Sequence, residues 1–185
     1  GGKPIPTLQS IDVSDKVIYM NTFTKTLSST VRISYMVLPA SLTELFYKNL
    51  SFYSCTVSNF EQYTLARFME SGSFEKHINR LRNYYQNKRD AILEIFKTAP
   101  LDQYITIKEE DSGVHFMMKL KTDRTEIDIL SDAKSKGIKL APLSKYFVGQ
   151  TSNMSFQNVY VMNYSSIDLE QLPLIFDALC HILIK

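Results

Sequence analysis

Two short apolar runs flank a polar segment near the start of the chain. Residues 17–20 and 33–38 are rich in β-branched and aromatic side chains. Short apolar runs bounded by turn residues are typical of buried strands. Residues 21–30 between the runs carry too many hydroxyl and amide groups to be core. The pattern therefore predicts two buried strands joined by a polar turn that holds Lys25, with Arg32 entering the second strand.

Helical periodicity follows these strands. A capping-box spacing that begins at Ser41 predicts a short helix, and residues 56–70 predict a second one. In residues 74–98 apolar side chains recur at spacings of three, four and seven. This pattern predicts an amphipathic helix of roughly 35 Å at 1.5 Å per residue. Its scattered basic residues, Lys88 among them, fit a solvated helix face.

The second half of the chain predicts a compact α/β sandwich. Runs of β-branched and alternating residues indicate strands, and hydroxyl side chains at cap positions indicate where two helices begin. In chain order we expect strands at 104–107 and 114–120, a helix from 125 that ends before Gly137, strands at 138–141 and 159–164, and a helix at 167–185.

Composition and charge narrow the classes of function. The chain has 185 residues, 44% hydrophobic and 22% charged, and a formal net charge of +2. This charge predicts little attraction to nucleic acid or to membranes. The sequence shows no DNA-binding pattern, no signal peptide and no apolar run of membrane length, and its cysteines and histidines lack metal-ligand spacing. We therefore expect no metal site, no membrane partner and a cytoplasmic location.

Lys25 and Arg32 are the candidate chemistry of the polar turn. A lysine held against an apolar sheet loses hydration, which lowers its pKa and frees the amine to attack carbonyl groups. An arginine with threonine hydroxyls nearby suits a phosphate. On spacing alone, solvated loop charges are the more frequent explanation of such a pair.

Several short motifs extend this picture over nearly the whole chain. TFTKTL at 22–27 and VRISYMVLP at 31–39 place an arginine seven residues after a lysine, and further motifs are PIPTLQ at 4–9, FEQ at 60–62, FMESG at 68–72, GVHF at 113–116 and PLSKY at 142–146. Together they resemble the aminotransferase-like domain of the MocR-type (GabR-like) bacterial regulators. That domain has the fold of the fold-type-I pyridoxal-phosphate (PLP) enzymes, the aspartate-aminotransferase fold, and follows a winged-helix DNA-binding domain.

The resemblance implies roles for four residues. Lys25 matches the lysine that forms a Schiff base with PLP. Arg32 matches the arginine that pairs with the cofactor phosphate, and Thr22 matches a hydroxyl that reaches the same phosphate. Lys145 stands where the family has an arginine that anchors the substrate carboxylate. A lysine keeps the positive charge but lacks the two parallel donors with which arginine binds a carboxylate. Binding of an effector other than the family's usual carboxylate therefore stays an alternative at this position.

The resemblance also implies the architecture of an α/β chain. Residues 1–85 would be the C-terminal part of the large PLP-binding domain, including part of its sheet and the start of a long linking helix, and 86–185 would be the small α/β sandwich domain. In the family, the aspartate that pairs with the pyridine nitrogen, the ring-stacking aromatic residue and the DNA-binding domain all precede this stretch. We therefore expect the chain to be the C-terminal portion of a longer protein.

The function that follows from the resemblance is the effector-sensing, PLP-binding part of a MocR/GntR-family transcriptional regulator. Its expected partners are an amino-acid-like effector or substrate, a second copy in a homodimer, and DNA through the missing N-terminal domain only. A fragment of a PLP-dependent class I/II aminotransferase and an interaction fragment without cofactor are the alternatives. Because part of the pocket is missing, the chain by itself is expected neither to transaminate nor to bind DNA.

Overall fold

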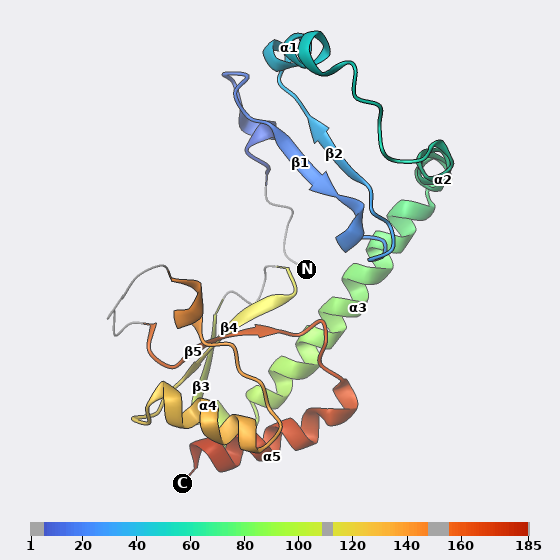
Figure 1. The fold of residues 1–185 in the computed structure, drawn as a ribbon. Coiled ribbons are helices and arrows are strands. Elements are labelled where there is room, and N and C mark those ends of the chain that lie inside the picture. The colour runs from blue at the N-terminus through green and yellow to red at the C-terminus, as the bar shows by residue number, and fades with distance from the viewer. Residues whose placement is uncertain (1–5, 109–112, 148–155, 185) are drawn as a thin grey trace. The chain divides into compact units, whose positions relative to one another are not determined.

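The computed structural model describes residues 6–108, 113–147 and 156–184 (Figure 1). Contacts within the chain group it into two compact units, Lys3–Arg80 and Leu81–Lys185. The division lies within helix α3 (Ser73–Phe96), so this helix supplies residues to both units.

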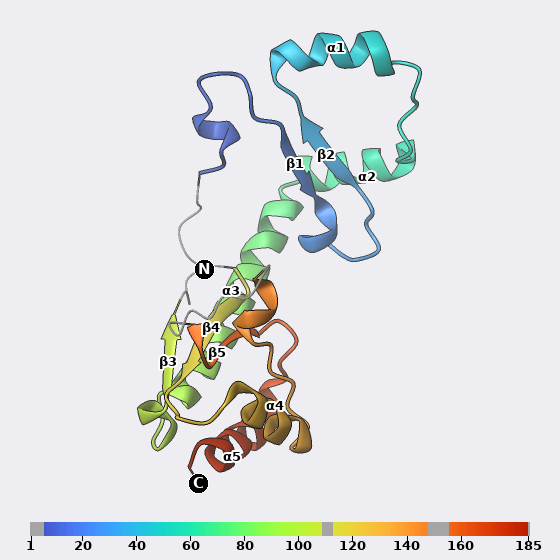
Figure 2. The same cartoon turned by 60° about the vertical axis from the view of Figure 1, so that its left-hand side comes forward.

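The strand pair of the Lys3–Arg80 unit carries the predicted polar turn. Strands β1 (Tyr19–Thr22) and β2 (Ser34–Val37) pair antiparallel, and Thr22 lies opposite Ser34. The one-turn 3-10 helix η2 (Phe23–Lys25) follows β1 directly. Figure 2 shows η2 at one end of the strand pair and α1 (Ala40–Leu50) at the other. The two strands and the polar turn between them are as the sequence predicts.

The expectation that both strands are buried is wrong for this chain. All four residues of β2 are exposed, and the two central residues of β1 are exposed as well. Within the described residues, this sheet has two strands. A two-stranded sheet has few neighbours to cover its faces, so apolar strand residues stay in contact with solvent.

The helices α1 and α2 (Asn59–Glu70) of this unit begin in different ways. The amides of Ala40 and Ser41 lie 3.3 Å from the carboxylate oxygens of Asp15, so a distant aspartate, and not the predicted Ser41, binds the start of α1. Helix α2 follows Ser58, whose Oγ accepts from the Glu61 amide at 3.2 Å. The N-terminus of α2 is therefore capped locally.

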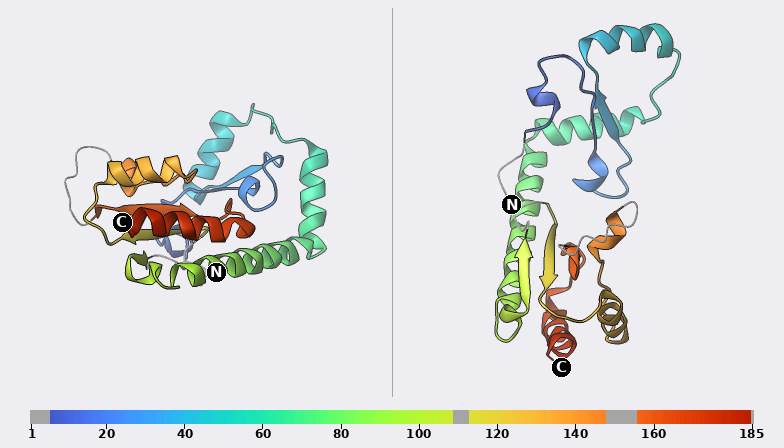
Figure 3. Two further views of the ribbon diagram at one scale, coloured as in Figure 1. Left: turned by 90° about the horizontal axis from the view of Figure 1, so that it is seen from below. Right: turned by 90° about the vertical axis from the view of Figure 1, so that its left-hand side faces the viewer.

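The Leu81–Lys185 unit is the predicted two-layer α/β sandwich. Its antiparallel sheet has the order β3 (Ile105–Lys108), β4 (His115–Leu120) and β5 (Val159–Asn163). Alternate residues of β4 are buried, so one face of the sheet packs against helices. These are α4 (Glu126–Ser135), α5 (Leu172–Leu183) and the end of α3. In the left view of Figure 3, α5 lies between α4 and the end of α3.

One predicted strand is wrong. Residues 138–141 form no strand; the Val161 amide donates to the Ala141 carbonyl at 2.8 Å, and the next residue, Pro142, forms an isolated bridge with Tyr160. Proline has no amide proton to donate, so it cannot continue a ladder of hydrogen bonds. The neighbouring helix α4 agrees with the sequence: Thr125 caps its start, and Gly137 follows its end with φ of 75°.

The last helix begins later than predicted. A 3-10 turn, η6 (Leu169–Gln171), precedes α5, and Pro173 lies in the first turn of α5. Proline is accommodated in the first helical turn and disrupts a helix interior, which explains why the helix does not start at 167. Lys185, where the helix was expected to end, lies outside the described residues. No helix within the described ranges is long and apolar enough to cross a bilayer.

Lys88 of α3 departs from the expected solvated face. Lys88 is only 6% exposed, and its Nζ donates to the Ser165 carbonyl at 2.9 Å. A buried ammonium group requires such a partner. The aliphatic part of the side chain therefore belongs to the packed interior, and the charge is held by a backbone dipole.

Two leucines of α5 give a matched test of this packing. Leu179 is 1% exposed in the core, whereas Leu174 is 70% exposed on the same helix. Leu179→Ala should lower the free energy of unfolding by about 2–5 kcal/mol because it leaves a cavity. Leu174→Ala should change it by less than about 0.5 kcal/mol. Urea denaturation of both variants measures the difference, and equal losses would contradict the assigned core.

Candidate functional site

The turn that carries Lys25 is closed by hydrogen bonds to the returning strand. The Phe23 amide donates to the Ile33 carbonyl at 2.9 Å, and Thr24 Oγ1 donates to the Val31 carbonyl at 2.8 Å. The Leu27 amide donates to the Phe23 carbonyl at 2.8 Å. The polar side chains predicted to be unsuitable for core thus satisfy backbone groups, which holds η2 against the start of β2.

Thr22 is the N-cap residue of η2. Its Oγ1 accepts from the Thr24 amide at 3.3 Å. Its single proton is directed to Thr24 Oγ1 at 3.0 Å or to the Ile33 carbonyl at 3.1 Å. A phosphate oxygen can therefore receive this proton only if the hydroxyl turns away from both acceptors.

Lys25 and Arg32 both present their charges to solvent. Lys25 is the last residue of η2 and Arg32 comes just before the buried Ile33, and both side chains are exposed. Lys25 is therefore not held against an apolar sheet in this chain. Among residues 6–108, 113–147 and 156–184, neither side chain has a hydrogen bond or an ion pair. An amine and a guanidinium group are thus available on one short segment.

The first residue of η2, Phe23, packs against two other aromatic rings. The Phe23 ring lies 5.3 Å from the Tyr35 ring and 6.1 Å from the Phe74 ring, the latter edge-on at 77°. Such edge-to-face pairs are favourable in addition to their buried area. A hydrogen bond with Tyr19, together with burial, raises the pKa of Tyr35. Tyr35 therefore stays neutral at physiological pH and acts as a packing and hydrogen-bonding group.

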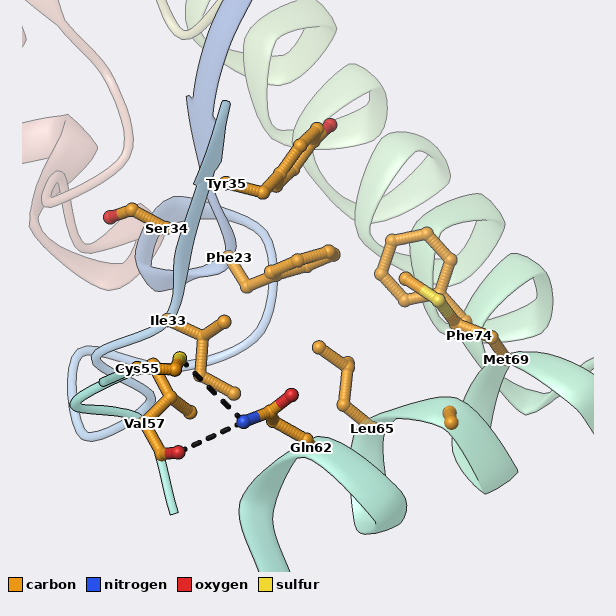
Figure 4. Close-up of a pocket in the computed structure, with 11 residues that line it drawn as sticks. Phe23, Ile33, Ser34, Tyr35, Cys55, Val57, Gln62, Leu65, Met69 and Phe74 are labelled. Atoms are coloured by element: carbon orange, nitrogen blue, oxygen red, sulfur yellow. Dashed lines mark hydrogen bonds between the residues drawn. The ribbon is translucent and has the colours of Figure 1, made fainter. Parts of the chain in front are cut away.

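A groove of about 640 Å³ lies beside this support and is shown in Figure 4. Its lining is mainly apolar, with Phe23, Ile33 and Leu65 among the side chains that point into it. Gln62 also faces the groove, but its Nε2 donates to the Val57 carbonyl at 2.9 Å. Thr22, Lys25 and Arg32 do not line the groove. Among the residues that the structure describes, the lining of the groove therefore has no cationic donor of the kind that a phosphate requires.

Lys145 belongs to the other unit. It lies on the 3-10 helix η4 (Leu143–Tyr146) and is exposed. The neighbouring Ser144 Oγ donates to Glu126 Oε1 at 2.8 Å, which ties η4 to the first turn of α4. The structure thus brings Thr22, Lys25 and Arg32 together on one segment and places Lys145 on a separate one.

The donor set around Lys25 fits PLP. The cofactor has an aldehyde, which a primary amine can bind covalently, and a phosphate, which a guanidinium and a hydroxyl can bind. Lys25, Arg32 and Thr22 supply these three groups. In contrast, no three His, Cys, Asp or Glu side chains gather as a metal site in the part of the chain that the structure describes.

Solved structures identify the fold. The chain superposes on the kynurenine aminotransferase of Pyrococcus horikoshii with a TM-score of 0.74 and 23% identity, over 100% of this chain and 44% of that one. The fold is therefore that of the PLP-dependent aminotransferases, as predicted. No protein-family model matches the chain.

Sequence relatives refine this class. The uncharacterized HTH-type transcriptional regulator YdeL of Bacillus subtilis is 39% identical over 143 residues, which cover 77% of this chain and 31% of YdeL. The probable rhizopine catabolism regulatory protein MocR of Rhizobium meliloti is 29% identical over 167 residues, which cover 90% of this chain and 33% of MocR. The chain is thus a relative of the MocR-type transcriptional regulators, and it spans about a third of the length of the curated relatives it matches.

His77 is a residue near the site that motif spacing did not indicate. Its Nε2 lies 3.0 Å from the Thr26 carbonyl oxygen, directly after Lys25 in the chain. The contact joins residues 51 positions apart, so no local pattern predicts it. The available signal is the spacing of Phe74 and His77, which are on one face of α3 at i and i+3.

The cap at Thr22 gives a test of how the turn is built. Thr22→Val removes the hydroxyl, so the Thr24 amide should lose its acceptor. Loss of an N-cap costs about 1 kcal/mol, and we expect roughly fivefold faster amide exchange at Thr24. Thr22→Ser keeps the hydroxyl and is the control. Unchanged exchange at Thr24 in the valine variant, measured by NMR, would contradict the cap.

Proposed function

We propose that the chain is the effector-sensing, PLP-binding, aminotransferase-like part of a MocR/GntR-family transcriptional regulator. The observation that supports this proposal most directly is the pattern of hydrogen bonding in the turn that carries Lys25. Most polar groups of this segment are hydrogen-bonded to one another, while the Lys25 amine and the Arg32 guanidinium are exposed and unpaired among the described residues. The segment therefore keeps two cations free for a ligand.

Each residue would contribute one kind of interaction. Bound PLP supplies an electron-accepting ring for chemistry at amino acids. Lys25 would hold the cofactor through its amine, and Arg32 would pair with the phosphate through its planar fork of donors. Thr22 would add a hydroxyl after a change of rotamer, because its proton is directed to protein acceptors in this structure. The hydrogen bonds from the Phe23 amide to the Ile33 carbonyl and from Thr24 Oγ1 to the Val31 carbonyl would keep Lys25 and Arg32 at a constant spacing.

Lys145 is proposed to recognise a carboxylate of an amino-acid-like effector or substrate. A lysine provides a point charge and not a bidentate fork, so recognition would be less selective for carboxylate geometry than with arginine. A regulator that senses an effector tolerates this difference better than an enzyme that must orient a reacting carbon.

A PLP-dependent aminotransferase is the second candidate, because the solved neighbour with a TM-score of 0.74 is itself an aminotransferase. Keto-acid formation by the complete protein from a panel of amino acids separates the two. Regulation is preferred because the 39% identity to YdeL exceeds the 23% identity to that enzyme.

Residues 1–85 would belong to the PLP-binding domain and 86–185 to the small domain of a cytoplasmic protein. Large side chains such as Tyr47 and Phe52 are exposed in the Lys3–Arg80 unit, which supports burial in a homodimer or against other parts of the protein. DNA would be bound through a separate domain, since the chain carries a net charge of only +2.

Substitution of the two cations tests the cofactor site in the complete protein. Lys25→Ala should abolish the visible absorbance of lysine-bound PLP, because no other amine is assigned to the cofactor. Arg32→Ala should raise the Kd for PLP roughly tenfold or more, since hydrogen bonds to a charged group contribute about 1.5–3 kcal/mol. Spectrophotometric titration with PLP measures both effects.

Lys48→Ala is the matched control, because Lys48 is an exposed lysine on α1 of the same unit. It should leave the absorbance and the Kd unchanged. Retention of the full absorbance in Lys25→Ala would refute the assignment of Lys25.

A further inference from the structure

The first two turns of α3 contact both ends of the turn that carries Lys25. Phe74 packs edge-on against Phe23, the first residue of η2, with 6.1 Å between ring centroids. One helical turn later, His77 Nε2 lies 3.0 Å from the carbonyl oxygen of Thr26, which is the C-cap residue of η2. The two contacts therefore bracket Lys25 from one face of one helix.

The imidazole of His77 is held in place by an aromatic neighbour. The ring of Phe68, from α2, lies 6.4 Å from the His77 ring and 6.3 Å from the Phe74 ring. Because a carbonyl oxygen only accepts hydrogen bonds, His77 Nε2 must carry the proton and donate it to Thr26. The half-buried imidazole is thus restricted in both position and tautomer.

The Thr26 carbonyl is the group that requires this donor. Carbonyls at the C-terminal end of a helix have no partner within that helix. Helix η2 is a single turn, closed at its C-terminal end by the amides of Thr26 and Leu27, which donate to the Phe23 carbonyl at 3.1 and 2.8 Å. One-turn 3-10 helices are weak, so a bond from a long helix contributes a large share of the order at this end.

We propose that His77 is a positioning residue for Lys25. By donating from Nε2 to the Thr26 carbonyl, it fixes the C-terminal end of η2 to α3 and so sets the direction in which the Lys25 amine leaves the backbone. This role rests on the proposed function of Lys25 as the lysine that holds PLP. His77 itself does not touch the cofactor in this assignment.

Two substitutions separate the donor from the ring. His77→Phe keeps a ring against Phe68 but removes the donor, whereas His77→Gln keeps a donor at similar reach and removes the ring. In the complete protein, His77→Phe should raise the Kd for PLP roughly fivefold, as expected for one net hydrogen bond, and His77→Gln should stay within about twofold of wild type. Spectrophotometric titration measures the Kd.

A second readout needs no cofactor. Without the donor, the amides of Thr26 and Leu27 should exchange faster in His77→Phe, by a similar factor, and return to wild-type rates in His77→Gln. Hydrogen exchange measured without PLP reports this directly. Should His77→Phe fail to fold, His77→Asn replaces it, because the shorter amide does not reach the Thr26 carbonyl.

The outcomes distinguish the two proposals. Loss of PLP absorbance in Lys25→Ala, with unchanged binding and exchange in His77→Phe, would overturn the role of His77 alone. Binding by His77→Gln as weak as that of His77→Phe would overturn it too, because the donor would then not be the feature that matters. Full absorbance in Lys25→Ala would overturn the function of Lys25 and, with it, the role of His77.

Discussion

The backbone carbonyls of Val31 and Ile33 hold the turn between β1 and β2. They accept from Thr24 Oγ1 at 2.8 Å and from the Phe23 amide at 2.9 Å. These hydrogen bonds act together with the packing of the Phe23 ring against Tyr35 and Phe74. Since the Thr22 and Thr24 hydroxyls are used in this closure, Lys25 and Arg32 are left as the unpaired charged side chains of the turn among the described residues. The candidate site depends on this arrangement, in which hydroxyl groups close the turn and the two cationic side chains remain exposed.

Helix α3 contacts the closed turn at its first residues and the core of the Leu81–Lys185 unit at its last residues. Its first turns contribute Phe74 and His77 to the support of η2, and its last turns contribute Ile92, Leu93 and Phe96 to the core of the Leu81–Lys185 unit. One continuous helix thus takes part in the packing of both units. Long amphipathic helices of this kind are stabilised by tertiary packing more than by propensity.

Local patterns predicted the parts of the fold that depend on local physics. The strand pair, α3, and the cap of α4 at Thr125 follow from periodicity and capping chemistry. Features that depend on distant residues were missed: the cap of α1 comes from Asp15, 25 residues before Ala40, and the Thr26 carbonyl is bound by His77. The burial of β1 and β2 was overestimated, because period and composition do not reveal how many strands a sheet has. The assignment of Lys25, Arg32 and Thr22 as site residues came from the resemblance to a family, because their spacing alone favours solvated charges.

The central claim is that the Lys25 turn presents one amine for covalent attachment of PLP. The most direct measurement is to reduce the complete, PLP-loaded protein with borohydride and locate the reduced cofactor by peptide mass spectrometry. The account predicts a single major modified peptide that contains Lys25. Modification spread over many exposed lysines, or concentrated at a different one, would contradict it.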